Sequence, residues 1–470
     1  MFRQASVAAA LYVLIALTPS WCNDSTPSMY SLQDAIDQAM LKNHQFRSLV
    51  NGVEVAGLDY EMARSVFKTK LRGQMNSDAR NGADIGSTYN LGLSKRNESG
   101  SAYGVGLYYS QFGFKELSEL RFSYTLPFFQ NPVTSGKFDS DKASLDFRHR
   151  ERMAKIGAEE LVLKVVSAYY RHSLAGDQAD VAAGEVAIVR KLQQATRIRA
   201  KTGRSSEMDV QWADLRVGQA EQRREMAKFQ RAKSENDLKL LLGLELDESI
   251  VIDEDIPPVA NPDLMLMSAA EVEELALKNR AELIGLGEDL DLARRKLRAS
   301  PSKRMPGFDV SLQYAVVGEG TTFSDSLQFD DTRVGLGISM DVDLMGNPDQ
   351  TYRRLALFYD DKRRGYEQLE GEIRASVKDA VFRMQDEGGK LRLARQSLKL
   401  AEQQFKMMEL KYRAGSASTQ EMLEAEQAMS DARYTEMTSR VDFLLSSYRV
   451  RLVAGTLMDE LNVNEPEMVQ

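Results

Sequence analysis

The sequence predicts an α+β protein built from two copies of one unit: a helix, β-strands, a long helix, a tight turn and a returning helix. The clearest sign is a turn that occurs twice. Helical patterns stop at Gly203 and Gly415 and restart at Ser206 and Ser418, 212 positions apart in both cases. Glycine ends a helix in the left-handed conformation without strain, and serine caps the first amides of the next helix. Alternating strand patterns and long helical patterns in each half complete the unit.

Other short motifs repeat at different offsets. Residues 41–43 recur at 277–279, an offset of 236, and residues 131–132 recur at 347–348, an offset of 216. The offset therefore falls by 20 positions across the strand region of the first half. We expect an extra hairpin or a long folded loop among those strands.

The elements of each unit follow in order. A helix begins near Ser31, and its counterpart in the second half begins near Glu271. Alternation of large apolar with small or polar residues, with many Gly and Tyr, is typical of membrane β-strands. Strands of a soluble sheet would show the same alternation. The strand patterns are 70–76, 89–94, 103–109 and 120–126 in the first half, and 308–314 and 334–340 in the second, with a polar loop at 318–331 that we expect to be exposed and flexible.

Long helical patterns follow the strands. They cover residues 140–202 and 352–413, with returning helices at 206–242 and 418–454. At 1.5 Å per residue the longer pair would reach about 90 Å and the shorter pair about 55 Å. Helices of this length cannot bury their apolar stripes inside one compact domain. We expect them to pack lengthwise against their own hairpin partners and against other subunits.

Local composition indicates the boundaries of the two repeats and the segments at the two ends of the chain. Residues 1–22 resemble an export signal, with a short apolar core that is too short to cross a bilayer. We place the first repeat at 23–256, a proline-rich linker at 257–267, the second repeat at 268–456 and an acidic tail at 457–470. Cys22 is a possible lipid acceptor, although Trp21 before it fits a lipidation motif poorly.

Composition narrows the function. The net charge of −8 and the absence of a basic patch with interleaved aromatic residues argue against a nucleic-acid partner. One cysteine rules out an intrachain disulfide framework and a cysteine-based zinc site, and three dispersed histidines form no metal-ligand pattern. No pair of carboxylates and no nucleophile with a neighbouring base stands out. We therefore expect no metal, no cofactor and no enzyme activity.

The order of elements, together with the repeated turn motifs 412–425 and 203–213, resembles the TolC-like outer-membrane efflux protein family over essentially the whole mature chain. The resemblance implies a homotrimer whose strands share one β-barrel through outer-membrane lipid and whose helices form a hollow periplasmic barrel. It implies a passive channel of a tripartite efflux pump or a type I secretion system, working with a periplasmic adaptor and an inner-membrane pump. The few strands of one protomer could not close a barrel, which fits a trimer.

The resemblance also implies a functional site at the periplasmic tip. Glu421 and Glu424 share a helix face, so three copies would form two acidic rings that attract cations; the plainer alternative is a capping acid and a solvated acid. Tyr412 and Asp209 match residues that hold the family's resting entrance shut. The residues of the two turns would form the adaptor-docking surface: Gly203, Arg204, Ser205, Ser206, Gly415, Ser416, Ala417 and Ser418.

One position departs from the family pattern. The family's arginine two residues after the second turn glycine is replaced by Ala417, so the entrance must be latched differently, with Arg204 or Arg413 as candidates. The rival function is a periplasmic coiled-coil adaptor or scaffold without a pore. The alternating strands placed between the helices favour the channel.

Overall fold

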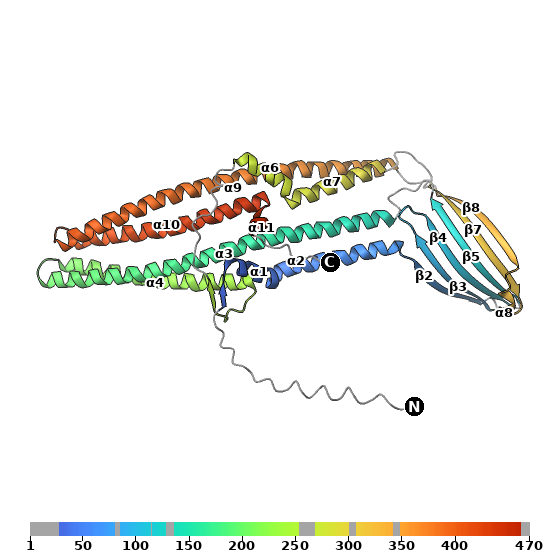
Figure 1. Cartoon of the computed structure of the whole chain (residues 1–470), viewed down its shortest axis with the longest axis horizontal. Helices are drawn as coiled ribbons and strands as arrows, with labels where there is room; N and C mark the ends of the chain where they lie inside the picture. Colours follow the sequence, from blue (N-terminus) through green and yellow to red (C-terminus); the bar gives the residue numbers. More distant parts are fainter. Residues whose placement is uncertain are drawn as a thin grey trace, which may run out of the picture.

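The computed structural model describes residues 28–79, 85–113, 115–127, 136–252, 268–299, 307–341 and 348–461. The long helices run side by side along one axis, and a β-sheet lies beyond one end of them (Figure 1). The elements of the first half are β1 (Ser28–Tyr30), α1 (Leu32–Lys42), α2 (His44–Arg64), η1 (Ser65–Phe67), β2 (Lys70–Ala79), β3 (Ile85–Arg96), β4 (Ala102–Phe112), β5 (Lys115–Pro127), α3 (Gly136–Lys201), α4 (Glu207–Leu242) and β6 (Ile250–Ile252). Those of the second half are α6 (Ala269–Asn279), α7 (Ala281–Ala299), β7 (Gly307–Gly320), α8 (Phe323–Ser326), β8 (Asp331–Asp341), α9 (Pro348–Arg413), α10 (Thr419–Ala454) and α11 (Leu457–Glu460).

Corresponding helices of the two halves have matching lengths. Helices α1 and α6 have 11 residues each, α3 and α9 have 66 each, and α4 and α10 have 36 each. At 1.5 Å per residue, α3 and α9 are each about 100 Å long. Helix α3 packs along α4, and α9 packs along α10, so each half contributes one long hairpin. The mixed helix and strand class is as the sequence predicted.

The six longer strands form one antiparallel sheet in the order β2-β3-β4-β5-β7-β8. Four of them come from the first half and two from the second. The extra segment that the shifted offset indicated is therefore a hairpin rather than a folded loop. Strands β2 and β8 are the two edges of this sheet.

The sheet has one apolar face and one polar face. Because side chains alternate along a strand, the registers place whole rows of like residues across all six strands. One apolar row reads Leu71, Leu93, Val105, Phe122, Tyr314 and Val334. The neighbouring row on the opposite face reads Arg72, Gly92, Gly106, Arg121, Ala315 and Arg333.

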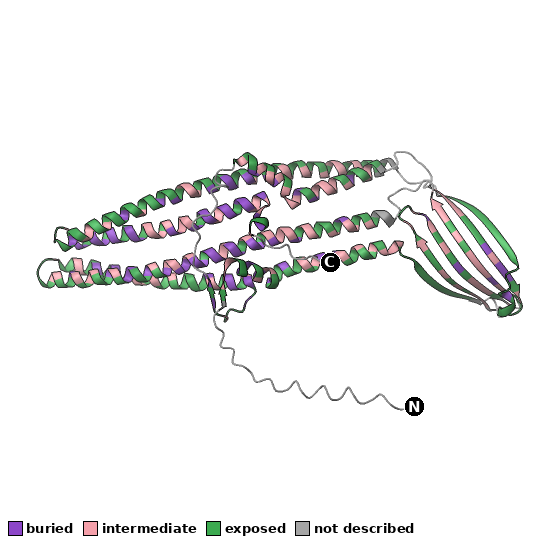
Figure 2. Cartoon of the chain, viewed as in Figure 1, coloured by how far each residue is buried: buried purple, intermediate pink, exposed green. Residues whose placement is uncertain are grey.

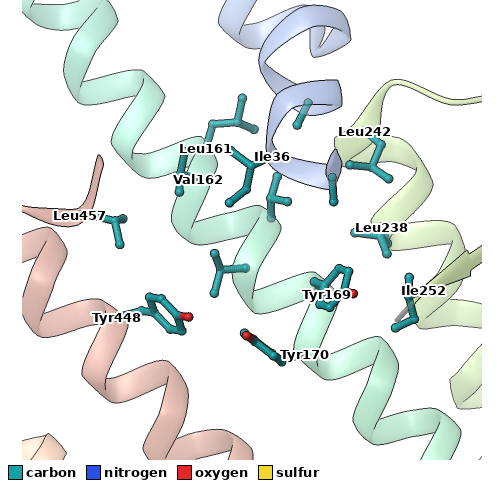
Figure 3. Packing of buried hydrophobic residues seen from close by; sticks show 14 of the residues in the cluster. Ile36, Leu161, Val162, Tyr169, Tyr170, Leu238, Leu242, Ile252, Tyr448 and Leu457 are labelled. Carbon is teal, nitrogen blue, oxygen red and sulfur yellow. The ribbon is translucent and has the colours of Figure 1, made fainter. Parts of the chain in front are cut away.

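The main core lies about half-way along the helices, where both repeats meet. Figure 3 shows Ile36 of α1, Tyr169 and Tyr170 of α3, Leu238 of α4 and Tyr448 of α10 gathered in one cluster. The ring of Tyr170 stacks on that of Tyr448, with their centroids 6.2 Å apart. Figure 2 shows the buried residues gathered along the helices, whereas most of the sheet is exposed or half-buried. Apolar burial therefore stabilises the helical part much more than the sheet of a single chain.

Two expectations need correction. The segment 318–331, expected to be a flexible loop, continues β7 to Gly320 and contains α8, whose Ser326 is buried with its hydroxyl 2.8 Å from that of Ser118. The segment from 457 was placed in an acidic tail, but Leu457 and Met458 of α11 are buried in the main core. In both segments a few apolar or small residues pack locally although the average composition is polar. The short parallel pair β1 and β6 was not anticipated.

Several predictions fall on residues that the structure does not describe. These are the export signal 1–22 with Cys22, the linker 257–267, the motif at 131–132 and the chain after 461. The boundaries of the two repeats stay predictions. Within the described ranges, no helix combines the length and the apolar character needed to cross a bilayer.

The junction between α4 and α1 yields a stability prediction. Gly243 ends α4 with φ +67, and an added Cβ would lie 2.8 Å from the Lys42 carbonyl oxygen. We expect Gly243→Ala to lower the free energy of unfolding by about 1–3 kcal/mol, because a left-handed alanine is strained and the contact is too close. Gly218→Ala is the matched control in α4, since an added Cβ there meets nothing within 4 Å. The measurement is thermal unfolding of both variants, followed by the circular dichroism of the helices. Equal melting temperatures for the two variants would contradict this explanation.

Candidate channel entrance

Two turns lie at the end of the helices farthest from the sheet, one between α3 and α4 and one between α9 and α10 (Figure 1). Both have the hydrogen bonds of a Schellman motif. Gly203 N donates to Ala200 O at 3.0 Å, and Arg204 N donates to Arg199 O at 2.9 Å. In the second repeat Gly415 N and Ser416 N make the equivalent bonds at 3.1 and 2.9 Å. Both glycines have positive φ, +71 and +79, which explains why glycine stands at these positions.

Each returning helix begins with a complete capping box. Ser418 N donates to Glu421 Oε2 at 2.8 Å, and Glu421 N donates to Ser418 Oγ at 3.2 Å. Ser206 and Asp209 repeat this arrangement at the start of α4. The hydrogen bonds from the backbone and hydroxyl of Ser418 lower the pKa of Glu421. Its carboxylate is therefore ionised at neutral pH, as an acidic entrance would require.

Glu421 and Glu424 are both exposed on α10, and Gln420 Nε2 donates to Glu424 Oε1 at 2.9 Å. The opposite side of this helix, with Met422 and Leu423, is buried against the neighbouring helices. Both carboxylates therefore share the solvent-facing side, as their spacing predicted. The capping role of Glu421 is real, and it leaves the carboxylate exposed. The rings themselves stay a prediction because they need three chains.

Tyr412 is buried near the tip and joins the two repeats. Its hydroxyl lies 3.2 Å from Thr196 Oγ1, which in turn donates to Thr419 Oγ1 at 3.4 Å. Arg199 of α3 donates to the Tyr412 carbonyl, and its guanidinium carbon lies 3.7 Å from the centroid of the Tyr412 ring. The two residues predicted to close the entrance therefore have different partners within one chain. Tyr412 contacts Thr196 and Arg199 of α3, whereas the Asp209 carboxylate accepts a hydrogen bond from the Ser206 hydroxyl.

Arg199 was missed in the sequence. The available signal was weak, namely a basic residue four positions before the turn glycine, which Lys411 matches in the second repeat. Of the two arginines considered as substitutes for the family arginine, Arg413 pairs with Glu409 of its own helix, and Arg204 is exposed on the turn. At the tip, Arg199 connects the two hairpins through its contacts with Tyr412.

A buried charge cluster lies behind the entrance. Arg216 Nη2 of α4 donates to Glu185 Oε1 of α3 at 2.8 Å and to Glu426 Oε2 of α10 at 2.9 Å. The three side chains are at most 7% exposed. Arg223 lies 3.5 Å from Glu185 and 3.1 Å from Asp431. These ion pairs link the helical hairpins of the two repeats, and their acids on α10, Glu426 and Asp431, follow Glu421 and Glu424 along the helix.

No group of three or more His, Cys, Asp or Glu side chains is arranged to hold a metal ion in the part of the chain that the structure describes. Among the remaining residues of the two turns, Ser205 and Ala417 are half-buried and Ser416 is exposed. The tip of the single chain therefore presents an exposed surface that carries the ionised carboxylate of Glu421.

The family model for outer membrane efflux proteins matches residues 117–244 and 272–456. The chain belongs to this family. Outer membrane efflux proteins are channels of the outer membrane, and this chain is placed there with its helices in the periplasm. The comparisons give no support to a periplasmic scaffold without a pore.

Individual relatives are distant. The outer membrane protein TolC of Vibrio cholerae is 22% identical over 335 residues, which are 69% of this chain and 74% of that protein. The alkaline protease secretion protein AprF of Pseudomonas aeruginosa is 22% identical over 315 residues, 64% of this chain and 62% of that protein. The open state of the MtrE outer membrane channel of Neisseria gonorrhoeae matches with a TM-score of 0.65 at 16% identity, covering 91% of this chain and 89% of that chain. At this identity the structural match concerns the fold.

Proposed function

We propose that three copies of this chain form a continuous conduit, with the sheets in outer-membrane lipid and the helices enclosing a periplasmic duct that is narrowest at the turns. The conduit is passive and catalyses no reaction. Solutes enter at the acidic tip and leave through the sheet end.

The observation that carries this proposal is the six-stranded sheet, whose apolar face and two edge strands are uncovered in the part of the single chain that the structure describes. One face of this sheet is apolar in every strand, and neither edge strand has a partner among the residues that the structure describes. The sheet lies at the end of helices about 100 Å long. An apolar face suits lipid, and further copies would satisfy the edge strands. Lengthwise contact with other copies would also cover apolar residues that are exposed on the long helices, such as Phe229, Leu393 and Leu400.

The proposed partners follow from the same geometry. The two exposed turns form the surface for a periplasmic adaptor, through which an inner-membrane pump delivers substrate. AprF is named for the secretion of a protease, so polypeptides as well as small solutes are candidate cargo for this chain. We propose no nucleic-acid partner and no cofactor.

The test of the channel is single-channel recording in planar bilayers, with the natural protein beside Glu421→Gln/Glu424→Gln. Removing six carboxylates from a trimer should reduce the preference for cations and weaken block by a trivalent cation on the order of tenfold, which corresponds to about 1.4 kcal/mol.

Glu54→Gln/Glu98→Gln is the matched control, because it removes the same number of exposed acids from α2 and from the β3–β4 turn, away from the tip. An equal loss of selectivity in both variants would overturn the assignment of the acidic rings and keep the channel. Folded protein that forms no pore would overturn the proposed function itself.

A further inference from the structure

The described part of the first repeat contributes four strands to the sheet, and that of the second contributes two. We propose that the sheets of three copies close into a single barrel of 18 strands. This inference rests on the trimeric channel proposed above and specifies its outer-membrane part. Such a barrel requires that all six strands of each chain belong to one layer and that the edge strands of neighbouring copies can pair.

The extra hairpin lies within the layer. Strands β2 and β3 pair over ten residue pairs from Lys70–Ser94 to Ala79–Ile85, and β3 pairs with β4 over ten more. The apolar row from Leu71 to Val334 and the polar row from Arg72 to Arg333 pass through all six strands without changing face. A hairpin that folded into the lumen or over the rim would break these rows.

The polar face of the layer also suits a lumen. Gly92 and Gly106 lie side by side on it, and the Tyr108 ring covers Gly106, where an added Cβ would lie 2.9 Å from that ring. The guanidinium carbon of Arg121 lies 4.5 Å from the centroid of the Tyr108 ring. Around Gly106 this face therefore carries small residues with a flat and a charged side chain lying over them, whereas most of the bulky aliphatic side chains of the sheet are on the other face.

The edges are complementary in direction. Strand β2 leaves the helices and β8 returns to them, so β8 of one copy and β2 of the next run antiparallel, as all neighbours in the sheet do (Figure 1). A register that places Leu71 opposite Met340 keeps both faces continuous and also places Met75 opposite Leu336.

The apolar side chains of the two edge strands are also highly exposed. Val334, Leu336 and Ile338 of β8 are 70–73% exposed, and Leu71 of β2 is 68% exposed. On the inner strands Val105, Phe122 and Tyr314 of the same apolar face are only 37–43% exposed. Neither edge strand contains proline, and both carry apolar side chains along their length. A long apolar edge of this kind is a template for pairing with another strand, and unpaired backbone groups do not persist in lipid.

The strand number sets the width of the pore. Barrel diameter grows roughly linearly with the number of strands, and 16–18 strands leave an open aqueous channel. An 18-stranded barrel is about 1.5 times as wide as one built from four strands per chain. The outer-membrane section is then a wide exit, and the helical tip decides what passes.

The test uses the full-length protein and a shortened variant. Cryo-electron microscopy of the protein in lipid nanodiscs should show a trimer with 18 strands. A trimer with a barrel of fewer strands would overturn this inference and leave the channel intact, whereas protein without a trimeric pore would overturn the proposed function as well.

The variant lacks residues 85–112, that is, β3 and β4. Because β2 ends and β5 begins at the same end of the sheet, the remaining strands can still pair antiparallel. Polyethylene glycols of graded size, added on the side of the sheet, should enter the full-length channel up to a radius about 1.5 times the limit of the variant. Equal limits would overturn the inference, and the strand count decides it if the variant does not fold.

Discussion

Replacing Arg216 with alanine is expected to lower the free energy of unfolding by about 3–5 kcal/mol, because it leaves two buried carboxylates without their shared cation. Glu185 and Glu426 are each 1% exposed, and both accept from the Arg216 guanidinium. Glu185 keeps a hydrogen bond from Ser430 at 3.1 Å and the more distant Arg223. Glu426 loses its guanidinium partner, so most of the cost falls on that carboxylate.

The loss of stability caused by Arg216→Ala should depend on pH. Burial raises the pKa of Glu426 above 4.5, and Arg216 opposes this shift. A carboxyl whose pKa is higher in the folded protein stabilises the fold most at pH values below its unfolded pKa, and this stability is lost as the pH rises through the folded value. Without Arg216 the pKa rises further. The variant should therefore lose more stability, relative to the natural protein, at pH 8 than at pH 5.

Arg190→Ala provides the control. Arg190 pairs with Glu221 across the same two helices, α3 and α4, but these side chains are 53% and 39% exposed. An exposed pair contributes less than about 1 kcal/mol. Thermal unfolding of the purified protein at both pH values separates the cases. Equal melting temperatures for the two variants, or a loss from Arg216→Ala that does not depend on pH, would contradict the assignment.

The turns, the duplication and the strands could be predicted because their causes are local. Gly203 and Gly415 need positive φ, and Ser206 and Ser418 need an amide to cap, whatever surrounds them. Strand alternation indicated the faces of the sheet, and the shift in offset indicated the extra hairpin. The turn and strand signals depend on residues within a few positions of one another, and the duplication follows from comparing such short motifs between the two halves.

The contacts that join the two repeats could not be predicted in this way. Arg199 and Tyr412 are 213 positions apart, and Arg216 and Glu426 are 210 apart. In the sequence Glu185 and Glu426 look like ordinary solvated helix positions. Only the arrangement of α3, α4 and α10 makes them buried, so their role depends on packing that no short pattern encodes. The direction in which Glu421 and Glu424 face within a trimer depends on other copies for the same reason.

Arg199→Ala is expected to loosen the contact between the two hairpins at the tip and to raise the conductance of the closed channel several-fold. Arg199 is stacked on the Tyr412 ring and donates to the Tyr412 carbonyl. A stacked cation contributes about 0.5–2 kcal/mol and a charged hydrogen bond about 1.5–3 kcal/mol. A loss of about 2 kcal/mol shifts an equilibrium between joined and separated hairpins about 30-fold, because each 1.4 kcal/mol is a factor of ten.

Two further variants show whether Arg199 itself is responsible. Tyr412→Phe keeps the ring for Arg199 and removes only the hydroxyl that bonds to Thr196, so its effect should be smaller, about 0.5–1.5 kcal/mol. Arg204→Ala removes the same charge from an exposed position on the neighbouring turn and should leave the closed conductance unchanged. If Arg199→Ala and Arg204→Ala raised the conductance equally, charge at the tip would explain the result, and Arg199 would not be the latch. The order Arg199→Ala, Tyr412→Phe, Arg204→Ala, from largest to smallest effect, is the result that the contacts of Tyr412 require.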